Sequence, residues 1–232
     1  MNPSSTFNAA GIEVIAFDLD GTLIDTSEAM YDVNHRVFEE AIRNGDAAHQ
    51  PSKETIRSAF GMTGQEAWKV VAAELDEEKQ DRYKQRHDER LGEAMRERSY
   101  ALDGVPQLLR RLSGKYELAT ASNCGQDYLD RVLDIDDLAG LIRYPLCAGN
   151  VGAKRKSEVL QELLRRSGRG ADRVLMVGDR KSDIEAAKEA GVAVIGVRSE
   201  FAEAGELDGA DAVIDSIGEL ESLLQSSADR SA

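Results

Sequence analysis

Two aspartates follow a single apolar run near the N-terminus, in the stretch VIAFDLDGTLIDT at residues 14–26. Asp18 and Asp20 come directly after that run with one residue between them, and Gly21 and Thr22 follow. Each carboxylate raises the free energy of ionising the other. A bound cation would remove this repulsion. A pair of acids at the end of a buried strand therefore indicates a site for a cation and a chemical role.

Polar side chains also end two later apolar runs. The run YELATA at 116–121 ends near Thr120 and Ser122, and the run RVLMVGD ends in Asp179, four residues before Asp183. Ligands bind beyond the carboxyl ends of the strands in an open parallel sheet, so these tips predict one shared site. Oxygen ligands at this density suit Mg²⁺, which usually shares its coordination with phosphate oxygens.

The spacing of apolar runs predicts the scaffold that positions these residues. Runs of strand length recur at 13–19, 116–121, 143–148, 173–179, 192–197 and 211–216. Helical patterns at 105–112, 156–166 and 182–191 lie between the later runs. This alternation predicts an α/β protein with a mostly parallel sheet covered on both faces.

Residues 24 to about 98 interrupt the alternation because they contain no convincing strand. Their pattern predicts helices at about 27–43, 52–60, 64–74 and 77–98. We therefore expect a core formed by residues 1–23 and 97–232, and a helical insert at 24–96. Residues 1–10 and 225–232 are expected to be loose tails.

Composition limits the classes of partner. The 232 residues are 41% hydrophobic and 31% charged, and no apolar run approaches the roughly 20 residues of a membrane helix. The net charge of −14 would repel nucleic acid and anionic membranes. Solubility is the favoured explanation of this charge, and adaptation to high salt is the alternative. With two cysteines, Cys124 and Cys147, and no secretion signal, we expect free thiols and a cytoplasmic location.

Four motifs together resemble the signatures of the haloacid dehalogenase-like superfamily, which contains aspartyl-phosphate phosphohydrolases and mutases. FDLDGTL is similar to its first signature, LATAS to its second, KSEVL to its third and VGDRKSD to its fourth. They occur in the family's order, and the likeness covers residues 13 to 215. It implies a three-layer Rossmann-like core with a parallel sheet and a small inserted α-helical cap domain.

The resemblance implies distinct roles for the two aspartates. Asp18 would be the nucleophile that attacks phosphorus, and Asp20 the general acid and base. A neighbouring carboxylate raises the pKa of such an acid, which lets it hold a proton near neutral pH. Gly21 and Thr22 would contact the phosphate. The alternative is a pair of turn acids at a strand end with no chemical role.

The later signatures add phosphate-binding groups. Thr120 would donate a hydrogen bond to a phosphoryl oxygen, and Ser122 and Asn123 would contact phosphate too, although Asn123 could equally cap the next helix. The lysine of the third signature would be Lys156, because KSEVLQELL keeps the register of a lysine followed by a helix. The proline that usually follows this lysine is missing, so Lys154 is the fallback. The resemblance implies that Mg²⁺ is bound by four acids: Asp18, Asp20, Asp179 and Asp183.

Two glycines break the helical pattern in AFGMTGQEAW at 59–68. This segment is similar to the cap loop that dips toward the nucleophile in the family. Gly61, Met62 and Thr63 are therefore the candidates for substrate contact, and a simple helix–helix turn is the alternative.

These features predict a Mg²⁺-dependent phosphatase that hydrolyses a small phosphomonoester, such as phosphoglycolate or a sugar phosphate, through an aspartyl-phosphate. A β-phosphoglucomutase-like mutase is the main alternative, although the cap loop carries no basic residue before Lys69. A catalytically silent binding module on the same fold is the alternative from another class. The partner would be a small phosphorylated metabolite, and the sequence leaves open its identity and the choice between monomer and homodimer.

Overall fold

A parallel sheet forms the centre of the protein. The structure, a computed structural model, describes residues 7–135, 137–199 and 205–229. Within these residues the sheet has six strands in the order β3-β2-β1-β4-β5-β6. They are β1 (Val14–Phe17), β2 (Glu117–Ser122), β3 (Ile142–Cys147), β4 (Val174–Gly178), β5 (Ala193–Val197) and β6 (Ala212–Ile214). The expected parallel sheet is confirmed, and every strand forms within two residues of its expected position.

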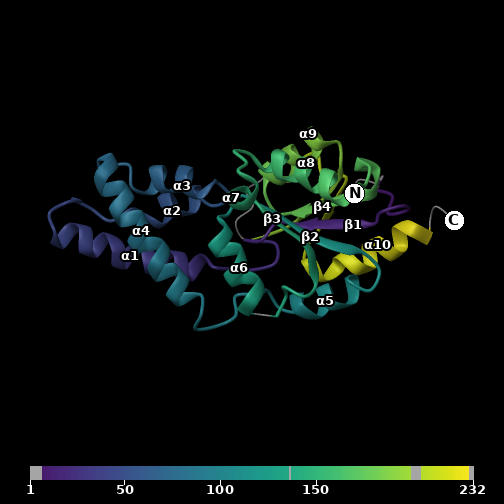
Figure 1. Cartoon of the computed structure of the whole chain (residues 1–232), viewed down its shortest axis with the longest axis horizontal. Helices are drawn as coiled ribbons and strands as arrows, with labels where there is room; N and C mark the ends of the chain where they lie inside the picture. The colour runs from purple at the N-terminus through teal and green to yellow at the C-terminus, as the bar shows by residue number, and fades with distance from the viewer. Residues whose placement is uncertain (1–6, 136, 200–204, 230–232) are drawn as a thin grey trace.

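Helices cover both faces of the sheet, as Figure 1 shows. Side chains of β1 alternate between the faces: Val14 and Ala16 pack in one buried cluster, Ile15 and Phe17 in the other. The first cluster includes residues of α8 (Lys156–Ser167) and α9 (Lys181–Ala190), and the second includes residues of α5 (Val105–Leu112), α6 (Gln126–Ile135) and α10 (Leu220–Asp229). This is the expected three-layer core, and burial on both faces explains why the strand sequences are almost continuously apolar.

Short helical turns complete the core. They are α7 (Ala148–Val151) after β3 and the 3-10 turns η1 (Ala171–Arg173) and η2 (Ile217–Glu219). None of the helices in the described ranges is long and apolar enough to cross a membrane.

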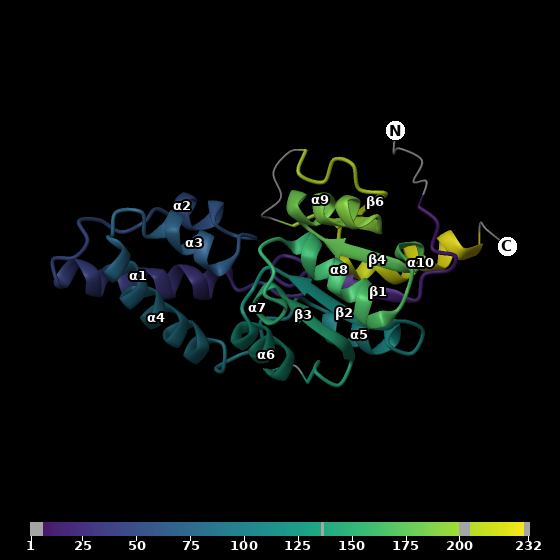
Figure 2. The same cartoon turned by 45° about the horizontal axis from the view of Figure 1, so that its top comes forward.

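Four helices between β1 and α5 form a separate lobe at the left of Figures 1 and 2, away from both chain ends. They are α1 (Ser27–Arg43), α2 (Lys53–Ser58), α3 (Gly64–Val71) and α4 (Glu77–Ala94). Trp68 is buried in this lobe, with its ring 6.2 Å from that of Phe38 and 5.3 Å from that of His87 between centroids. The expected helical cap is confirmed, while the exact boundaries at 24 and 96 remain a prediction.

The cap is joined to the core by two segments that lie side by side. Ile24 forms an antiparallel bridge with Ala101. Two backbone hydrogen bonds flank this bridge, from the Asp25 N–H to the Tyr100 carbonyl and from the Leu102 N–H to the Leu23 carbonyl, each 2.9 Å long. The chain therefore enters and leaves the cap at the same place.

The expectation of loose tails at 1–10 and 225–232 is wrong for the residues that the structure describes. Residues up to Asp229 belong to α10, and the buried Ser227 hydroxyl donates a 2.6 Å hydrogen bond to the Phe7 carbonyl. Phe7 and Ala9 are only 6% and 5% exposed. Both segments are polar by composition, but Phe7, Ala9 and Ser227 are buried where the two segments pack together. Residues 1–6 and 230–232 lie outside the described residues.

Candidate active site

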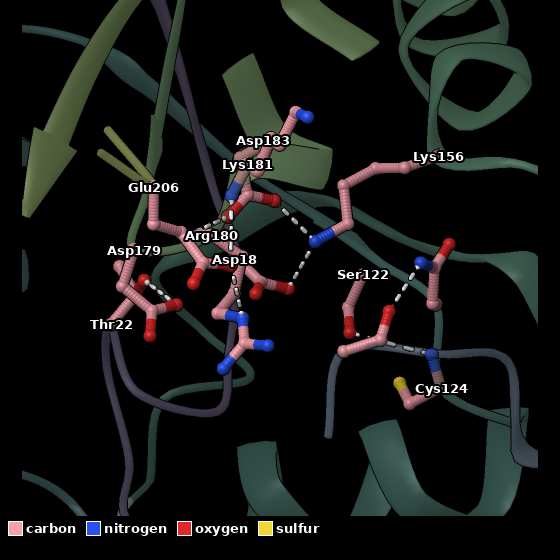
Figure 3. Close-up of polar contacts among 12 residues, drawn as sticks. Asp18, Thr22, Ser122, Cys124, Lys156, Asp179, Arg180, Lys181, Asp183 and Glu206 are labelled. Carbon is pink, nitrogen blue, oxygen red and sulfur yellow. Dashed lines mark hydrogen bonds and ion pairs between the residues drawn. The ribbon is translucent and has the colours of Figure 1, made fainter. Parts of the chain in front are cut away.

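Three carboxylates meet at the carboxyl edge of the sheet, as Figure 3 shows. Asp18 directly follows β1 and Asp179 directly follows β4, and these strands are neighbours in the sheet. Asp183 lies in the first turn of α9. All three are buried, and one oxygen of each lies within 4.8 Å of the others. The acids that were expected to share a site therefore do so.

Lys156 is the cation beside these acids. It is the first residue of α8, is only 3% exposed, and places Nζ 2.8 Å from Asp18 Oδ1 and in an ion pair with Asp183. Burial alone would lower the pKa of Lys156, but the negative charges of Asp18 and Asp183 outweigh burial and raise it. Lys154, the fallback, is exposed.

The charges at the site do not balance within the protein. Three ionised carboxylates face one ammonium, which leaves two negative charges in a buried region. Burial, followed by the charges of Asp18 and Asp183, raises the pKa of Asp179 to about 7. Burial also raises the pKa of Asp183 to about 6, although Lys156 opposes this change. This acidic cluster is therefore suited to a cation.

Two glycines allow the carboxylates to come so close together. A Cβ atom at Gly21, where φ is +81°, would lie 2.2 Å from Asp179 Oδ2. A Cβ at Gly178 would lie 2.3 Å from the Asp183 carboxyl group. Any side chain at either position would push a carboxylate out of the cluster.

Two hydroxyl groups hold Asp179 in place. Thr22 Oγ1 donates to Oδ1 at 3.3 Å, and Ser199 Oγ donates to Oδ2 at 2.7 Å. The buried hydroxyl of Thr22 faces Asp179 in the structure, and its expected contact with phosphate remains a prediction. Nothing in the sequence around Ser199 indicated its contact.

Asp20 has an environment of its own. Its Oδ1 accepts hydrogen bonds from the Tyr128 hydroxyl at 2.5 Å and from Thr26 Oγ1 at 2.7 Å. Burial raises the pKa of Asp20 to about 6, and the two hydrogen bonds offset part of that rise. Among the described residues, the acidic cluster comprises Asp18, Asp179 and Asp183, and the Asp20 carboxylate is not a member of it. No motif in the sequence indicated that Tyr128 or Thr26 would contact Asp20.

A model of haloacid dehalogenase-like hydrolases matches residues 15–197, which is most of the chain. The chain belongs to this family. A phosphoglycolate phosphatase from Mesorhizobium japonicum is 30% identical over 194 residues, with 79% of this chain and 82% of that protein covered. The resemblance inferred from the four motifs is thereby confirmed.

Solved structures share the fold of this haloacid dehalogenase-like hydrolase. A predicted phosphoglycolate phosphatase from Haemophilus somnus superposes with a TM-score of 0.80 at 20% identity, covering 92% of this chain and 98% of the other. A β-phosphoglucomutase from Clostridium difficile gives 0.77 at 19% identity, covering 95% and 98%. At this level of identity the likeness concerns the fold alone.

The second-signature hydroxyls of this hydrolase differ in their hydrogen bonds. Thr120 pairs with Phe17 in the sheet, is fully buried, and donates its hydroxyl hydrogen to the Leu146 carbonyl at 2.9 Å. A hydrogen bond from Thr120 to phosphate would therefore require an exchange of partner. The Ser122 hydroxyl accepts a hydrogen bond from the Cys124 N–H at 3.4 Å. Both phosphate contacts remain predictions.

The cap loop touches the core through Gly61. Asn123 Nδ2 donates to the Gly61 carbonyl at 2.8 Å, and a Cβ at Gly61 would lie 3.7 Å from Arg180 Cγ. Asn123 therefore contacts the cap, and α6 begins three residues later, at Gln126.

The other two cap-loop candidates are placed differently. Met62 is 40% exposed, and the Thr63 hydroxyl donates to Glu66 Oε2 at 2.8 Å within the cap. Their expected contacts with substrate remain predictions, whereas Gly61 does lie against the core.

Proposed function

We propose that the chain is a Mg²⁺-dependent phosphatase that hydrolyses a small phosphomonoester through an aspartyl-phosphate on Asp18. The observation that carries this proposal is the buried cluster of Asp18, Asp179 and Asp183, with Lys156 ion-paired at its edge. The curated relative described above is named a phosphoglycolate phosphatase, which supports a small phosphorylated acid or alcohol as the substrate class.

The residues present fit a magnesium ion. The donors are all carboxylate oxygens, and the two uncompensated negative charges of the cluster match one divalent cation. Asp18, Asp179 and Asp183 would hold the ion. When bound, Mg²⁺ would supply positive charge that lets a phosphate group approach these acids.

The first step would transfer the phosphoryl group to Asp18. A carboxylate oxygen of Asp18 attacks phosphorus, and the bond from phosphorus to the leaving oxygen breaks. Asp20 gives that oxygen a proton, and its pKa, raised to about 6, keeps a fraction of the molecules protonated near neutral pH. Lys156 remains charged throughout and stabilises the ionised form of Asp18 through their 2.8 Å ion pair.

The second step would regenerate the enzyme. The Asp20 carboxylate takes a proton from a water molecule as that water attacks phosphorus. The bond between phosphorus and Asp18 breaks, and inorganic phosphate is released. One side chain thus serves as acid in the first step and as base in the second.

Hydrolysis of p-nitrophenyl phosphate, with Mg²⁺ and with EDTA, tests the proposal. We expect turnover that requires the ion and is lost in Asp18→Asn, while the exposed control Asp172→Asn keeps it. A panel that includes phosphoglycolate, glycerol phosphates and β-glucose 1-phosphate then identifies the substrate class. Absence of phosphate release from every ester by the folded protein would refute the proposal, and conversion of β-glucose 1-phosphate to glucose 6-phosphate would replace it with the mutase alternative.

A further inference from the structure

Two side chains from separate parts of the chain meet at one oxygen of Asp20. Tyr128 comes from the first turn of α6, and Thr26 immediately precedes α1. Their hydroxyls lie 2.5 and 2.7 Å from Asp20 Oδ1 and 3.0 Å from each other. The two oxygens of the Asp20 carboxyl group are therefore not equivalent.

This asymmetry decides where a proton can reside on Asp20. A carboxyl oxygen that accepts hydrogen bonds from two hydroxyls acts as the acceptor, so the proton of the neutral acid belongs on the other oxygen, Oδ2. The phenol of Tyr128 is the donor in its contact with Oδ1, so its hydrogen is directed at that oxygen. Oδ2 is thereby the oxygen available to exchange a proton with a substrate.

Tyr128 and Thr26 differ in how firmly they are held. Thr26 is the N-cap residue of α1, so it belongs to the start of the cap, and its hydroxyl makes no capping hydrogen bond. Tyr128 belongs to α6, which packs on the sheet with its neighbour Leu129 fully buried. A movement of the cap would displace Thr26, whereas Tyr128 would keep its place beside Asp20.

We propose that Tyr128 is a positioning residue that binds Oδ1 of Asp20 and thereby directs the proton-bearing Oδ2 toward the leaving oxygen of the substrate. The proposal rests on the phosphatase function proposed above and adds a residue that none of the four sequence signatures contains. The phenol does not touch the reacting atoms and acts through Asp20 alone.

The test compares leaving groups that differ in their need for a proton. The p-nitrophenolate anion leaves without protonation, whereas an alkoxide must be protonated as it departs. The value of kcat/KM reports the steps up to departure of the leaving group, so it isolates the first proton transfer. It is measured with Mg²⁺ for p-nitrophenyl phosphate and for the alkyl phosphate of the panel that the wild-type enzyme hydrolyses fastest.

Tyr128→Phe keeps the ring and removes only the hydroxyl. We expect kcat/KM for the alkyl phosphate to fall about tenfold or more, and that for p-nitrophenyl phosphate to fall less than about threefold. Tyr144→Phe is the matched control, because it removes a half-buried hydroxyl that lies 3.3 Å from the carboxylate of Glu117, outside the site. In an Asp20→Asn background, Tyr128→Phe should cause no further selective loss.

A structural role for Tyr128 would lower both kcat/KM values by the same factor. Equal losses, no loss, or a selective loss that persists in the Asp20→Asn background would each overturn the proposal. The proposed phosphatase function would survive each of these outcomes, provided that the wild-type enzyme turns over and Asp18→Asn does not. Absence of wild-type turnover would instead refute the phosphatase function, and this inference with it.

Discussion

Replacement of Asp179 by asparagine should stabilise the protein when Mg²⁺ is chelated and abolish its response to the ion. Asparagine has nearly the same shape and can still bind the hydroxyls of Thr22 and Ser199, which hold Asp179 now. The substitution removes one negative charge from a buried cluster. The site would thus gain stability and lose function through the same change.

The pKa of Asp179 gives the size of the effect. The folded state raises it from 3.8 to about 7, chiefly through burial and then through Asp18 and Asp183. The folded protein therefore holds this proton more tightly than the unfolded chain. The contribution of protonated Asp179 to stability is complete below pH 3.8 and is lost as the pH rises to about 7. A rise of about three pKa units means that ionised Asp179 lowers the free energy of unfolding at pH 8 by at most about 4 kcal/mol.

Urea unfolding in EDTA at pH 5 and pH 8 measures this effect. We expect Asp179→Asn to raise the free energy of unfolding at both values, and the gain to be larger at pH 8 by roughly 2–3 kcal/mol. Asp172→Asn removes an equal charge from an exposed side chain and should show no such growth with pH. Mg²⁺ should stabilise the wild-type protein and leave the variant unchanged.

A gain that does not grow between pH 5 and pH 8 would refute the argument from buried charge. Equal stabilisation of both proteins by Mg²⁺ would refute the assignment of Asp179 as a ligand. The cost of the buried charge and the binding of Mg²⁺ by Asp179 are therefore tested separately.

Three further substitutions test other contacts of the site and the fold. Gly21→Ala should weaken activation by Mg²⁺ about 10–100-fold, because the added Cβ would displace a carboxylate. Gly11 has a similar positive φ, but no atom lies within 4 Å of its Cβ position, so Gly11→Ala should leave activation by Mg²⁺ unchanged. Asn123→Ala should raise KM about 2–10-fold by releasing the cap loop, and an unchanged KM would contradict that role. Ser227→Ala should lower the free energy of unfolding by about 1–2 kcal/mol with kcat unchanged, and a similar loss in the exposed Ser226→Ala would refute the contribution of the buried hydrogen bond.

Local patterns in the sequence were sufficient for the sheet and for the acids at its edge. Asp18 and Asp179 each come at the end of an apolar run, and parallel strands place such ends on one edge, so their meeting could be predicted. Lys156 followed from its position at the start of a helical pattern, together with the family resemblance. Apart from that resemblance, these predictions depended only on the spacing of residues along each segment.

Contacts between distant segments were beyond the reach of the same patterns. Tyr128 lies 108 residues from Asp20, and Ser199 lies 20 residues from Asp179, so no spacing rule links either pair. Composition also misassigned the two ends of the chain, because Phe7 and Ser227 stabilise each other only after both have reached the same face of the sheet. Such pairings depend on the assembled fold.

The paired segments at Ile24 and Ala101 make the cap a detachable module. If the chain were cut there and rejoined by a short turn, β1 would lead directly into α5 and then into the parallel strand β2. That connection is an ordinary strand–helix–strand crossover, which needs no cap to form. The cap can therefore lengthen, shrink or be exchanged between proteins while the register of the sheet, and with it the position of the acidic edge, stays the same.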